Sequence, residues 1–386
     1  MIVRDPSSIW WSEVAGPCSI VDEVVSCLLL NTQNVLLSIP DDLPWRNEMR
    51  ANIEAEFRSK AGLHDLVFDA IDVRDECSDV DDVARWLFEH YADRDIRNGY
   101  RDRSGPLVRY MVEHKVLANR LLWVKGVSSD KIACWVKFCR EYVPSGGVTD
   151  GMLVLENSTG GGFSTYKRLT VISYYDRITP HDIRLFNSIL LSQAAYTGYS
   201  DLWKQYITVL CAALCKDDAE ISCRLLGTTD FRTEDPLDSL RRIAQEPDLS
   251  RRGTCPEHIL SQVRSGEKAL LSSMVWSAQL QVVFPNIELK RISFIRGHHA
   301  DLLAVLAGHE IMQGPEKCRV RVLDPMDLEV TTLSYLASRT DYWPVGIILF
   351  APREKALFSC LHKLRNHLAH LECCSPQELS SMFDID

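Results

Sequence analysis

The 386-residue chain lacks any apolar run long enough to cross a membrane. A membrane-spanning helix needs roughly 20 consecutive, mostly apolar residues. Residues 1–6 also lack the basic stretch and the apolar core that begin a secretory signal. We therefore expect no membrane contact and a cytoplasmic location.

Clustered metal ligands are missing too. Thirteen cysteines are scattered along the chain, and no two of them form a Cys-x-x-Cys pair. Cys134 and Cys139, like Cys211 and Cys215, stand at helical spacing among apolar residues, which is typical of reduced, buried thiols. A structural zinc site needs several Cys or His residues at short spacings. The sequence therefore predicts no metal site.

A surplus of positive charge is also absent, because the formal net charge is −10. Proteins that bind a nucleic-acid backbone regardless of sequence carry a basic face. The composition argues against that class of protein. A local group of arginines leaves a brief contact with RNA open: Arg291, Arg296, Arg319 and Arg321.

The first half of the chain alternates short apolar runs with helical stretches. Strands are predicted at 34–39, 66–73, 121–126, 152–156 and 169–173, and helices at 46–60, 80–91 and 131–142. Continuous apolar strands separated by helices predict a parallel sheet with both faces covered. The predicted fold is therefore α/β, with a doubly wound, mostly parallel sheet in a domain of residues 1–180.

The rest of the chain is predicted to form two further parts. Residues 181–285 have a helical pattern, and residues 286–386 form a smaller mixed α/β part. The second part contains predicted strands at 287–295 and 318–323, with a strand or buried turn at 345–350. Its helices are predicted at 299–308, at 328–338 and from 352 to about 371.

The loop after the first predicted strand reads Pro-Asp-Asp-Leu-Pro-Trp-Arg over residues 40–46. The order of strands and helices over about residues 20–180 resembles that of a P-loop NTPase of the AAA or STAND kind, in which the loop after the first strand holds phosphate. Phosphate loops need glycines, so that backbone amides approach the phosphates, and a Lys-Ser/Thr pair. Here glycine and lysine are missing, and Asp41 and Asp42 would repel phosphate. The resemblance therefore implies an NTPase-like fold that has lost its phosphate site and takes no nucleotide cofactor.

Two other features could hold an anion or a metal. The glycine-rich segment 157–165 follows a strand, but another strand is predicted next where phosphate binding needs a helix, so a plain connection is favoured. Lys167 could still contact an anion.

Carboxylates at strand ends can bind magnesium, yet they also cap turns and helices, and capping is favoured here. These carboxylates are Asp69, Asp72, Asp75, Glu76 and Glu156, with Ser78 and Asp79 as a predicted helix start.

The last predicted helix begins with Pro352 and Glu354, which suit a first helical turn. Its apolar residues recur at helical spacing and predict one buried stripe, formed by Leu357, Leu361, Leu364, Leu368 and Leu371. At about 100° per residue, His362, Asn366 and His370 fall on the opposite face, and Arg365 lies at the flank of the stripe.

The run Arg365-Asn366-x-x-Ala369-His370 resembles the Arg-x4-His motif of HEPN-domain ribonucleases. In that family the helices of two subunits meet and form one site without a metal. The resemblance implies that Arg365 holds the scissile phosphate and that His370 acts on the 2′-hydroxyl or the leaving oxygen. Histidine titrates near neutral pH and arginine binds phosphate with a fixed fork, so this chemistry is coherent. Asn366 would orient the site by hydrogen bonding.

Three functions follow from these patterns. The leading hypothesis is a non-hydrolysing, NTPase-like regulatory or scaffold protein within a multi-subunit assembly, which resembles components of bacterial anti-phage or toxin–antitoxin systems. It predicts protein partners and self-association through the last helix. The second hypothesis is a HEPN-type endoribonuclease that uses Arg365 and His370. A magnesium-dependent enzyme at Asp69, Asp72 and Glu156 is the third.

Overall fold

The computed structural model describes residues 4–30, 33–61, 66–76, 80–101, 105–143, 147–159, 162–166, 168–250 and 252–384. The chain divides into two compact units. A sheet unit contains Ile2–Phe186 with Asp217–Glu220, and a helical unit contains Asn187–Lys216 with Ile221–Asp386. No helix in the described ranges is long and apolar enough to cross a membrane.

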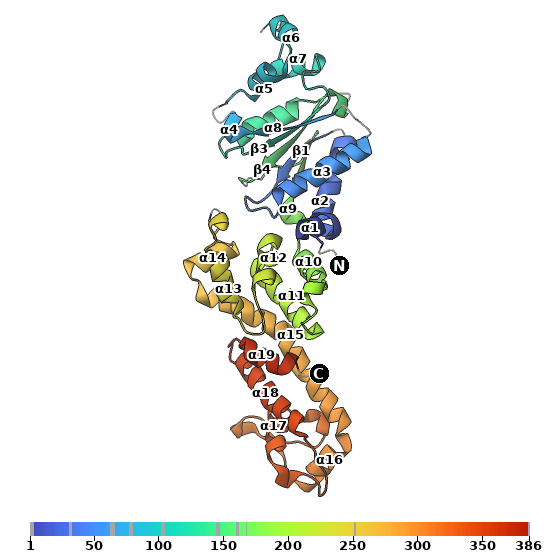
Figure 1. The fold of residues 1–386 in the computed structure, drawn as a ribbon, viewed down its shortest axis with the longest axis vertical. Helices are drawn as coiled ribbons and strands as arrows, with labels where there is room; N and C mark the ends of the chain where they lie inside the picture. The colour runs from blue at the N-terminus through green and yellow to red at the C-terminus, as the bar shows by residue number, and fades with distance from the viewer. Residues whose placement is uncertain are drawn as a thin grey trace. The chain divides into compact units, whose positions relative to one another are not determined.

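The sheet unit confirms the predicted α/β class, with a five-stranded parallel sheet in which β1 lies between β4 and β5. Figure 1 shows β1, β3 and β4 of this sheet with helices beside them. Its strands are β1 (Asn34–Ser38), β2 (Val67–Asp72), β3 (Arg120–Lys125), β4 (Met152–Asn157) and β5 (Leu169–Ser173), and their order across the sheet is β2-β3-β4-β1-β5. The helices of the first 191 residues are α1 (Pro6–Glu13), α2 (Ala15–Leu29), α3 (Arg46–Ala61), α4 (Val73–Glu76), α5 (Val83–Tyr91), α6 (Arg94–Gly99), α7 (Leu107–Glu113), α8 (Ile132–Glu141), α9 (Tyr174–Arg177) and α10 (Pro180–Leu191).

Both faces of the sheet are covered. On one face Leu36, Leu122 and Leu155 join a buried cluster with residues of α5, α7 and α8. On the other face Trp123 is fully buried, and Arg50 of α3 lies 5.9 Å from the centre of its ring. The inner strands β1, β3 and β4 are apolar over most of their length because neither face meets water, whereas the edge strand β2 is partly exposed and contains Asp69 and Asp72.

Two helices that we did not predict precede β1. Asp5 caps α1 by accepting a hydrogen bond from the Ser8 amide at 3.0 Å. Trp10 and Trp11 are both buried, and α2 is largely apolar. The buried apolar residues of α2 recur at helical spacing, so the sequence contained the signal for this helix. Among them are Ile20, Val21, Val24, Val25 and Leu28.

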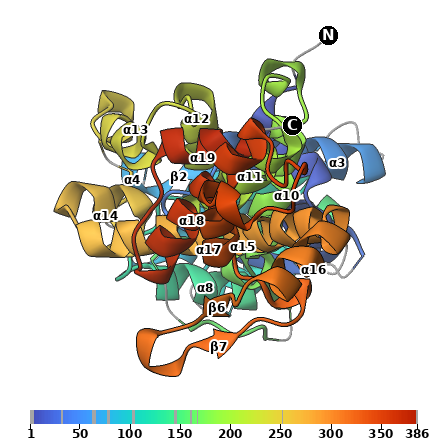
Figure 2. The ribbon, with the colours of Figure 1, turned by 90° about the horizontal axis from the view of Figure 1, so that it is seen from below.

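The helical unit contains the remaining helices and one short hairpin. The helices are α11 (Asp201–Cys215), α12 (Ala219–Thr228), α13 (Pro236–Ile243), α14 (Ile259–Ser265), α15 (Lys268–Gly297), α16 (His299–Gly308), α17 (Val330–Ser338), α18 (Pro352–Ala369) and α19 (Pro376–Phe383). The hairpin pairs β6 (Met312–Gln313) with β7 (Val320–Arg321) and projects from the helices around it (Figure 2).

The strand predicted at 287–295 is wrong, because these residues lie in the 30-residue helix α15. Its buried residues, among them Val283, Ile287 and Ile295, recur at helical intervals. Pro285, next to the expected domain boundary, lies inside this helix. A proline in a helix removes one backbone hydrogen bond, and here the packing of α15 along α11 outweighs that loss.

The strand predicted at 318–323 was too long, and of the two alternatives predicted for 345–350, a strand or a buried turn, the structure has the turn. Only Val320–Arg321 of the predicted strand 318–323 is paired, with β6. Residues 345–350 form turns, and Leu349 and Phe350 are buried there. A short apolar run does not by itself distinguish a strand from a turn that anchors in a core.

Candidate functional site

The last helix, α18, is held by the apolar stripe that the sequence predicts. Leu361, Leu364 and Leu368 are fully buried or nearly so, and Leu357 is half-buried. The Trp276 indole of α15 donates a hydrogen bond to the Leu368 carbonyl at 2.9 Å. The prediction for Leu371 is wrong: the helix ends at Ala369, and Leu371 follows it with φ of 61° and 73% exposure.

A polar groove of about 850 Å³ lies beside α18 within the helical unit. Arg365 and Asn366, two of the three predicted site residues, line it together with His362 from the previous turn of the helix. The other lining residues come from α17, from the β6–β7 hairpin and from their neighbours: Glu310, Ile311, Met312, Gln313, Gly314, Pro315, Arg319, Glu329, Thr331, Thr332, Tyr335 and Tyr342.

Asn366 and His362 are joined by a hydrogen bond of 2.9 Å between Asn366 Nδ2 and His362 Nε2. An amide nitrogen only donates, so Asn366 donates this bond and the His362 ring nitrogen accepts it. The bond holds the two side chains together at the edge of the groove.

Arg365 is half-buried and has no hydrogen bond, ion pair or ring contact with any described residue. Arg291 in the same unit shows the usual arrangement, because it pairs with Glu288 at 2.7 Å and donates to the carbonyls of Met326 and Leu328. A guanidinium has five N–H donors and no means of losing its charge. The groove thus contains an arginine whose donors are unused by the described chain.

His370, the third predicted site residue, does not line the groove. It is the exposed C-cap residue that follows Ala369, the last residue of α18, and its amide donates to the Asn366 carbonyl at 3.0 Å. Five residues separate it from Arg365, which turns it by about 140° around the helix axis, whereas His362 is about 60° away. The structure therefore groups Arg365 and Asn366 with His362. Helical spacing could have identified His362, but the contribution of Arg319 depends on how the chain folds.

The loop after β1 is closed by its own arginine. Arg46, the first residue of α3, donates to the carbonyls of Pro40 at 2.9 Å and Asp41 at 3.1 Å. Its other terminal nitrogen lies 3.6 Å from Oε2 of Glu156 at the end of β4. Glu156 is only 3% exposed, and its other oxygen accepts a hydrogen bond from the Trp123 indole at 2.7 Å.

The loop also has the length of a phosphate loop without its chemistry. Residues 40–47 span the eight positions of the pattern G-x-x-x-x-G-K-[ST]. Trp45 stands at the second glycine position and has φ of 45°, a left-handed conformation that glycine adopts most easily. Arg46 stands at the lysine position but is turned onto the loop carbonyls and Glu156.

The carboxylates near the end of β2 are engaged by neighbouring groups. Asp69 accepts from the Tyr91 hydroxyl at 2.8 Å, and Asp72 pairs with Arg74 at 3.0 Å and with Lys125 at 3.5 Å. The hydrogen bond from the Arg74 side chain lowers the pKa of Asp72.

Asp72 also accepts from the Arg74 amide at 3.2 Å, as expected of a capping residue. Ser78 and Asp79, the predicted helix start, lie outside the described residues, and Asp82 caps α5 instead. In the described ranges, no three His, Cys, Asp or Glu side chains are grouped closely enough to hold a metal ion.

The glycine-rich segment is followed by β5, as predicted, and not by a helix. Gly160, Gly161 and Lys167 lie outside the described residues. Phe163 and Thr165 line a hollow of about 300 Å³ together with residues at the carboxyl ends of β1, β4 and β5.

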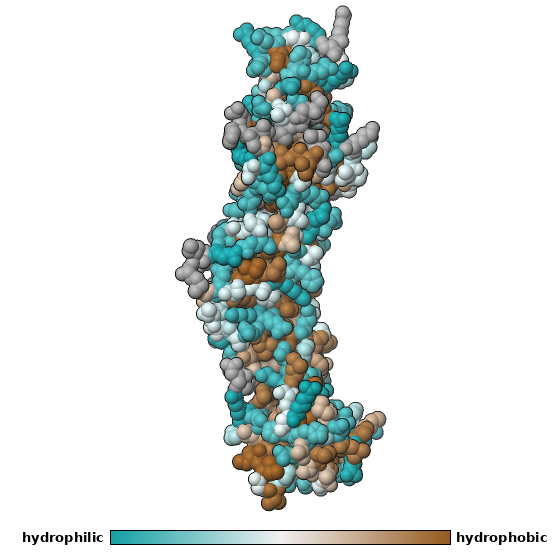
Figure 3. Space-filling model, turned by 90° about the vertical axis from the view of Figure 1, so that its right-hand side faces the viewer, coloured by the Kyte–Doolittle hydropathy of each residue, from teal (hydrophilic) through white to brown (hydrophobic). Residues whose placement is uncertain are grey.

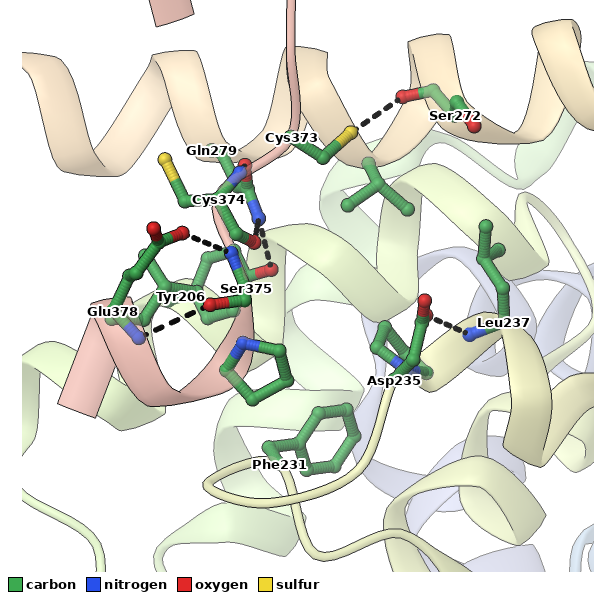
Figure 4. Close-up of a pocket in the computed structure, with 14 residues that line it drawn as sticks. Tyr206, Phe231, Asp235, Leu237, Ser272, Gln279, Cys373, Cys374, Ser375 and Glu378 are labelled. Carbon is green, nitrogen blue, oxygen red and sulfur yellow. Dashed lines mark hydrogen bonds between the residues drawn. The ribbon is translucent and has the colours of Figure 1, made fainter. Parts of the chain in front are cut away.

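A second cavity in the helical unit, of about 340 Å³, lies where the residues after α18 meet α15 (Figure 4). The Gln279 amide binds both backbone groups of Cys374, donating to its carbonyl at 2.8 Å and accepting from its N–H at 2.7 Å. Burial raises the pKa of Cys373 and raises that of Cys374 to about 12. Both thiols are therefore protonated at neutral pH and are poor nucleophiles.

No protein-family model matches the chain, and no curated protein sequence matches it. The features that bear on function are therefore the groove beside α18 and the closed loop after β1.

Proposed function

We propose that this protein is a non-hydrolysing, NTPase-like regulatory or scaffold component of a multi-subunit assembly. The observation that carries the proposal is the position of Arg46, whose guanidinium binds two loop carbonyls and faces Glu156. A phosphate loop turns backbone amides toward its ligand, whereas this loop turns carbonyls toward a resident cation. A bound triphosphate would have to displace the Arg46 guanidinium. Its negative charge would then lie beside the buried Glu156 carboxylate, and the two would repel each other.

The strand order supports the NTPase-like part of the proposal. The first strand lies between the fourth and the fifth, and the loop at its carboxyl end leads directly into α3. AAA and STAND NTPases, which the sequence resembles, share this order. Fold similarity alone does not establish an activity, so the loop chemistry decides against hydrolysis.

Exposed apolar residues of the helical unit support the scaffold part. Val345 is fully exposed, Ile348 is 75% exposed, and Leu323 and Val320 are also exposed. Apolar side chains reach the surface at the lower end of the view in Figure 3, at the level of α16 and α17 in Figure 1. Large exposed apolar patches on folded proteins commonly mark contacts with other proteins. We propose that protein partners bind here, and the anti-phage or toxin–antitoxin setting is part of this proposal.

The experiment is a titration of MgATP into the purified protein by calorimetry, with phosphate release measured in parallel. We expect no hydrolysis and no binding that depends on Arg46. Binding that disappears in Arg46→Ala, or release of phosphate by the wild type, contradicts the proposal. Sedimentation of the same samples tests self-association. If two copies associate through α18, the wild type should be a dimer, and charge-reversing substitutions on the exposed face of α18 should dissociate it.

A ribonuclease is the second candidate, and the unpartnered Arg365 beside Asn366 favours it. The test is cleavage of total RNA without added metal by the wild type, Arg365→Ala, His370→Ala and His362→Ala. Loss of cleavage in the Arg365 and His370 variants supports the motif-based site. Loss of cleavage in Arg365→Ala and His362→Ala, with cleavage retained in His370→Ala, supports a site within the groove. If the wild type does not cleave RNA, the ribonuclease candidate is rejected.

A further inference from the structure

We infer that the groove beside α18 binds a small ribonucleotide, with its phosphate at Arg365 and Arg319. The inference goes beyond the proposed function because it gives a regulatory chain a ligand in its helical unit, and the closed loop after β1 plays no part in it.

Two arginines, Arg365 and Arg319, line the groove. Neither Arg365 nor Arg319 forms an ion pair with a described residue, and Arg365 is half-buried. Partial burial of an unpaired guanidinium is unfavourable, and an anion in the groove would relieve that cost. Two guanidinium groups match the double negative charge of a phosphate monoester better than the single charge of a carboxylate.

The acidic residues of the groove indicate what the phosphate is attached to. Glu310 and Glu329 line the same groove, and neither forms an ion pair within the described chain. Carboxylates accept hydrogen bonds from the vicinal hydroxyls of a ribose, as the acidic residue of dinucleotide-binding folds does. The same carboxylates would repel the successive phosphates of an RNA strand, so a ligand with one phosphate group at the arginines is favoured.

Tyr335 and the size of the groove also suit a nucleotide. Tyr335 lines the groove and is 46% exposed, and the Arg339 guanidinium lies 5.5 Å from the centre of the Tyr335 ring. An exposed aromatic ring can pack against a nucleobase. The volume of about 850 Å³ falls within the range of pockets that hold small molecules and cofactors.

The experiment is a calorimetric titration of the full chain with each of four ligands: AMP, ribose 5-phosphate, adenosine and a short single-stranded RNA. We expect AMP to bind most tightly, because it alone supplies phosphate, ribose and base as one small unit. Arg365→Ala should weaken AMP binding about tenfold or more, which corresponds to about 1.4 kcal/mol. Arg365→Lys keeps the positive charge and the aliphatic stem but loses the two-pronged guanidinium. Its affinity for AMP should fall between those of the wild type and Arg365→Ala.

The matched control is Arg353→Ala, an exposed arginine of α18 that does not line the groove. This variant should bind AMP as the wild type does. The double variant Glu310→Gln with Glu329→Gln should weaken AMP but leave 2′,3′-dideoxy-AMP unchanged. Circular dichroism and the unfolding temperature identify any variant that fails to fold, and Arg365→Lys then carries the comparison.

Three results overturn the inference: no binding of AMP at millimolar concentration, equal effects of Arg365→Ala and Arg353→Ala, or binding of RNA without binding of AMP. None of them affects the proposed function. Conversely, ATP binding that is lost in Arg46→Ala but retained in Arg365→Ala rejects the non-hydrolysing scaffold and leaves the groove inference intact.

Discussion

At the residue scale, Arg46 occupies the loop that follows β1. Arg46 binds the carbonyls of Pro40 and Asp41 and compensates the buried Glu156. The sequence shows that glycine and lysine are missing from the loop, but it does not show that an arginine fills the site from within. That contact depends on the placement of β4 beside β1 in the folded sheet.

Arg46→Ala should destabilise the sheet unit by about 2–3 kcal/mol, because it leaves the Glu156 carboxylate buried and unpaired. Glu156→Gln should cost less, since the neutral amide needs no cation. The free energy of unfolding, measured by urea denaturation, checks both variants. In the double variant, Glu156→Gln should recover part of the loss; strictly additive effects would show that the pair does not interact.

Glu378 gives a prediction about pH. Burial raises its pKa, but Lys363 at 2.6 Å, the amide and hydroxyl of Ser375, and His367 lower it to about 2. A carboxylate with a lowered pKa stabilises the fold above its unfolded pKa of about 4.3 and loses that effect as the pH falls through the folded value.

Glu378→Gln should therefore lower the free energy of unfolding at pH 7 by about 0.5–1 kcal/mol. Glutamine keeps the capping pattern, so the difference reports the charge. Thermal unfolding between pH 7 and pH 2 measures it, and the two proteins should converge between about pH 4 and pH 2. A difference that is constant across this range means that the charge of Glu378 is not its source.

At the element scale, the sequence predicted the sheet and much of α18 correctly, because both repeat a pattern over several residues. The predicted strands and the stripe of Leu361, Leu364 and Leu368 rest on such repeats. The failures have local causes. Residues 287–295 are rich in isoleucine and follow a proline, yet they continue the helix α15. Phe294 packs there against Phe350 and against Phe358 of α18. Leu371 leaves the stripe because the helix ends two residues earlier.

The candidate site was predictable only in part, for the same reason. Arg365 and Asn366 stand on one helix, so their proximity follows from spacing. Arg319 and Tyr335 reach the groove from a hairpin and from another helix, which no single-sequence pattern brings together. His370 was chosen by motif, and the end of α18 places it outside the groove lining.

Gln279 of α15 should be required to hold the residues after α18 in place. It makes two hydrogen bonds to the backbone of Cys374, and its side chain is buried (Figure 4). Gln279→Ala leaves both backbone groups unsatisfied and should cost about 2 kcal/mol. Limited proteolysis should then cut near residues 371–375 much faster than in the exposed control Gln281→Ala; equal rates in the two variants would contradict this role.

At the scale of the whole molecule, we propose that other proteins bind the exposed apolar residues of the helical unit. These residues are Val320, Leu323, Val345 and Ile348. Replacing Val345 and Ile348 by serine should leave the unfolding temperature nearly unchanged, because both side chains are exposed. The same change should reduce self-association or partner binding, measured by analytical ultracentrifugation and by co-purification of partners. Unchanged association of the double variant would place the contact surface elsewhere.

The central claim is that the loop after β1 cannot take a triphosphate. The most direct measurement is a calorimetric titration of MgATP into Arg365→Ala, in which the groove beside α18 is disabled and the loop is left intact. The account predicts no binding at millimolar ATP and no release of phosphate. Micromolar binding that is abolished by adding Arg46→Ala would contradict it.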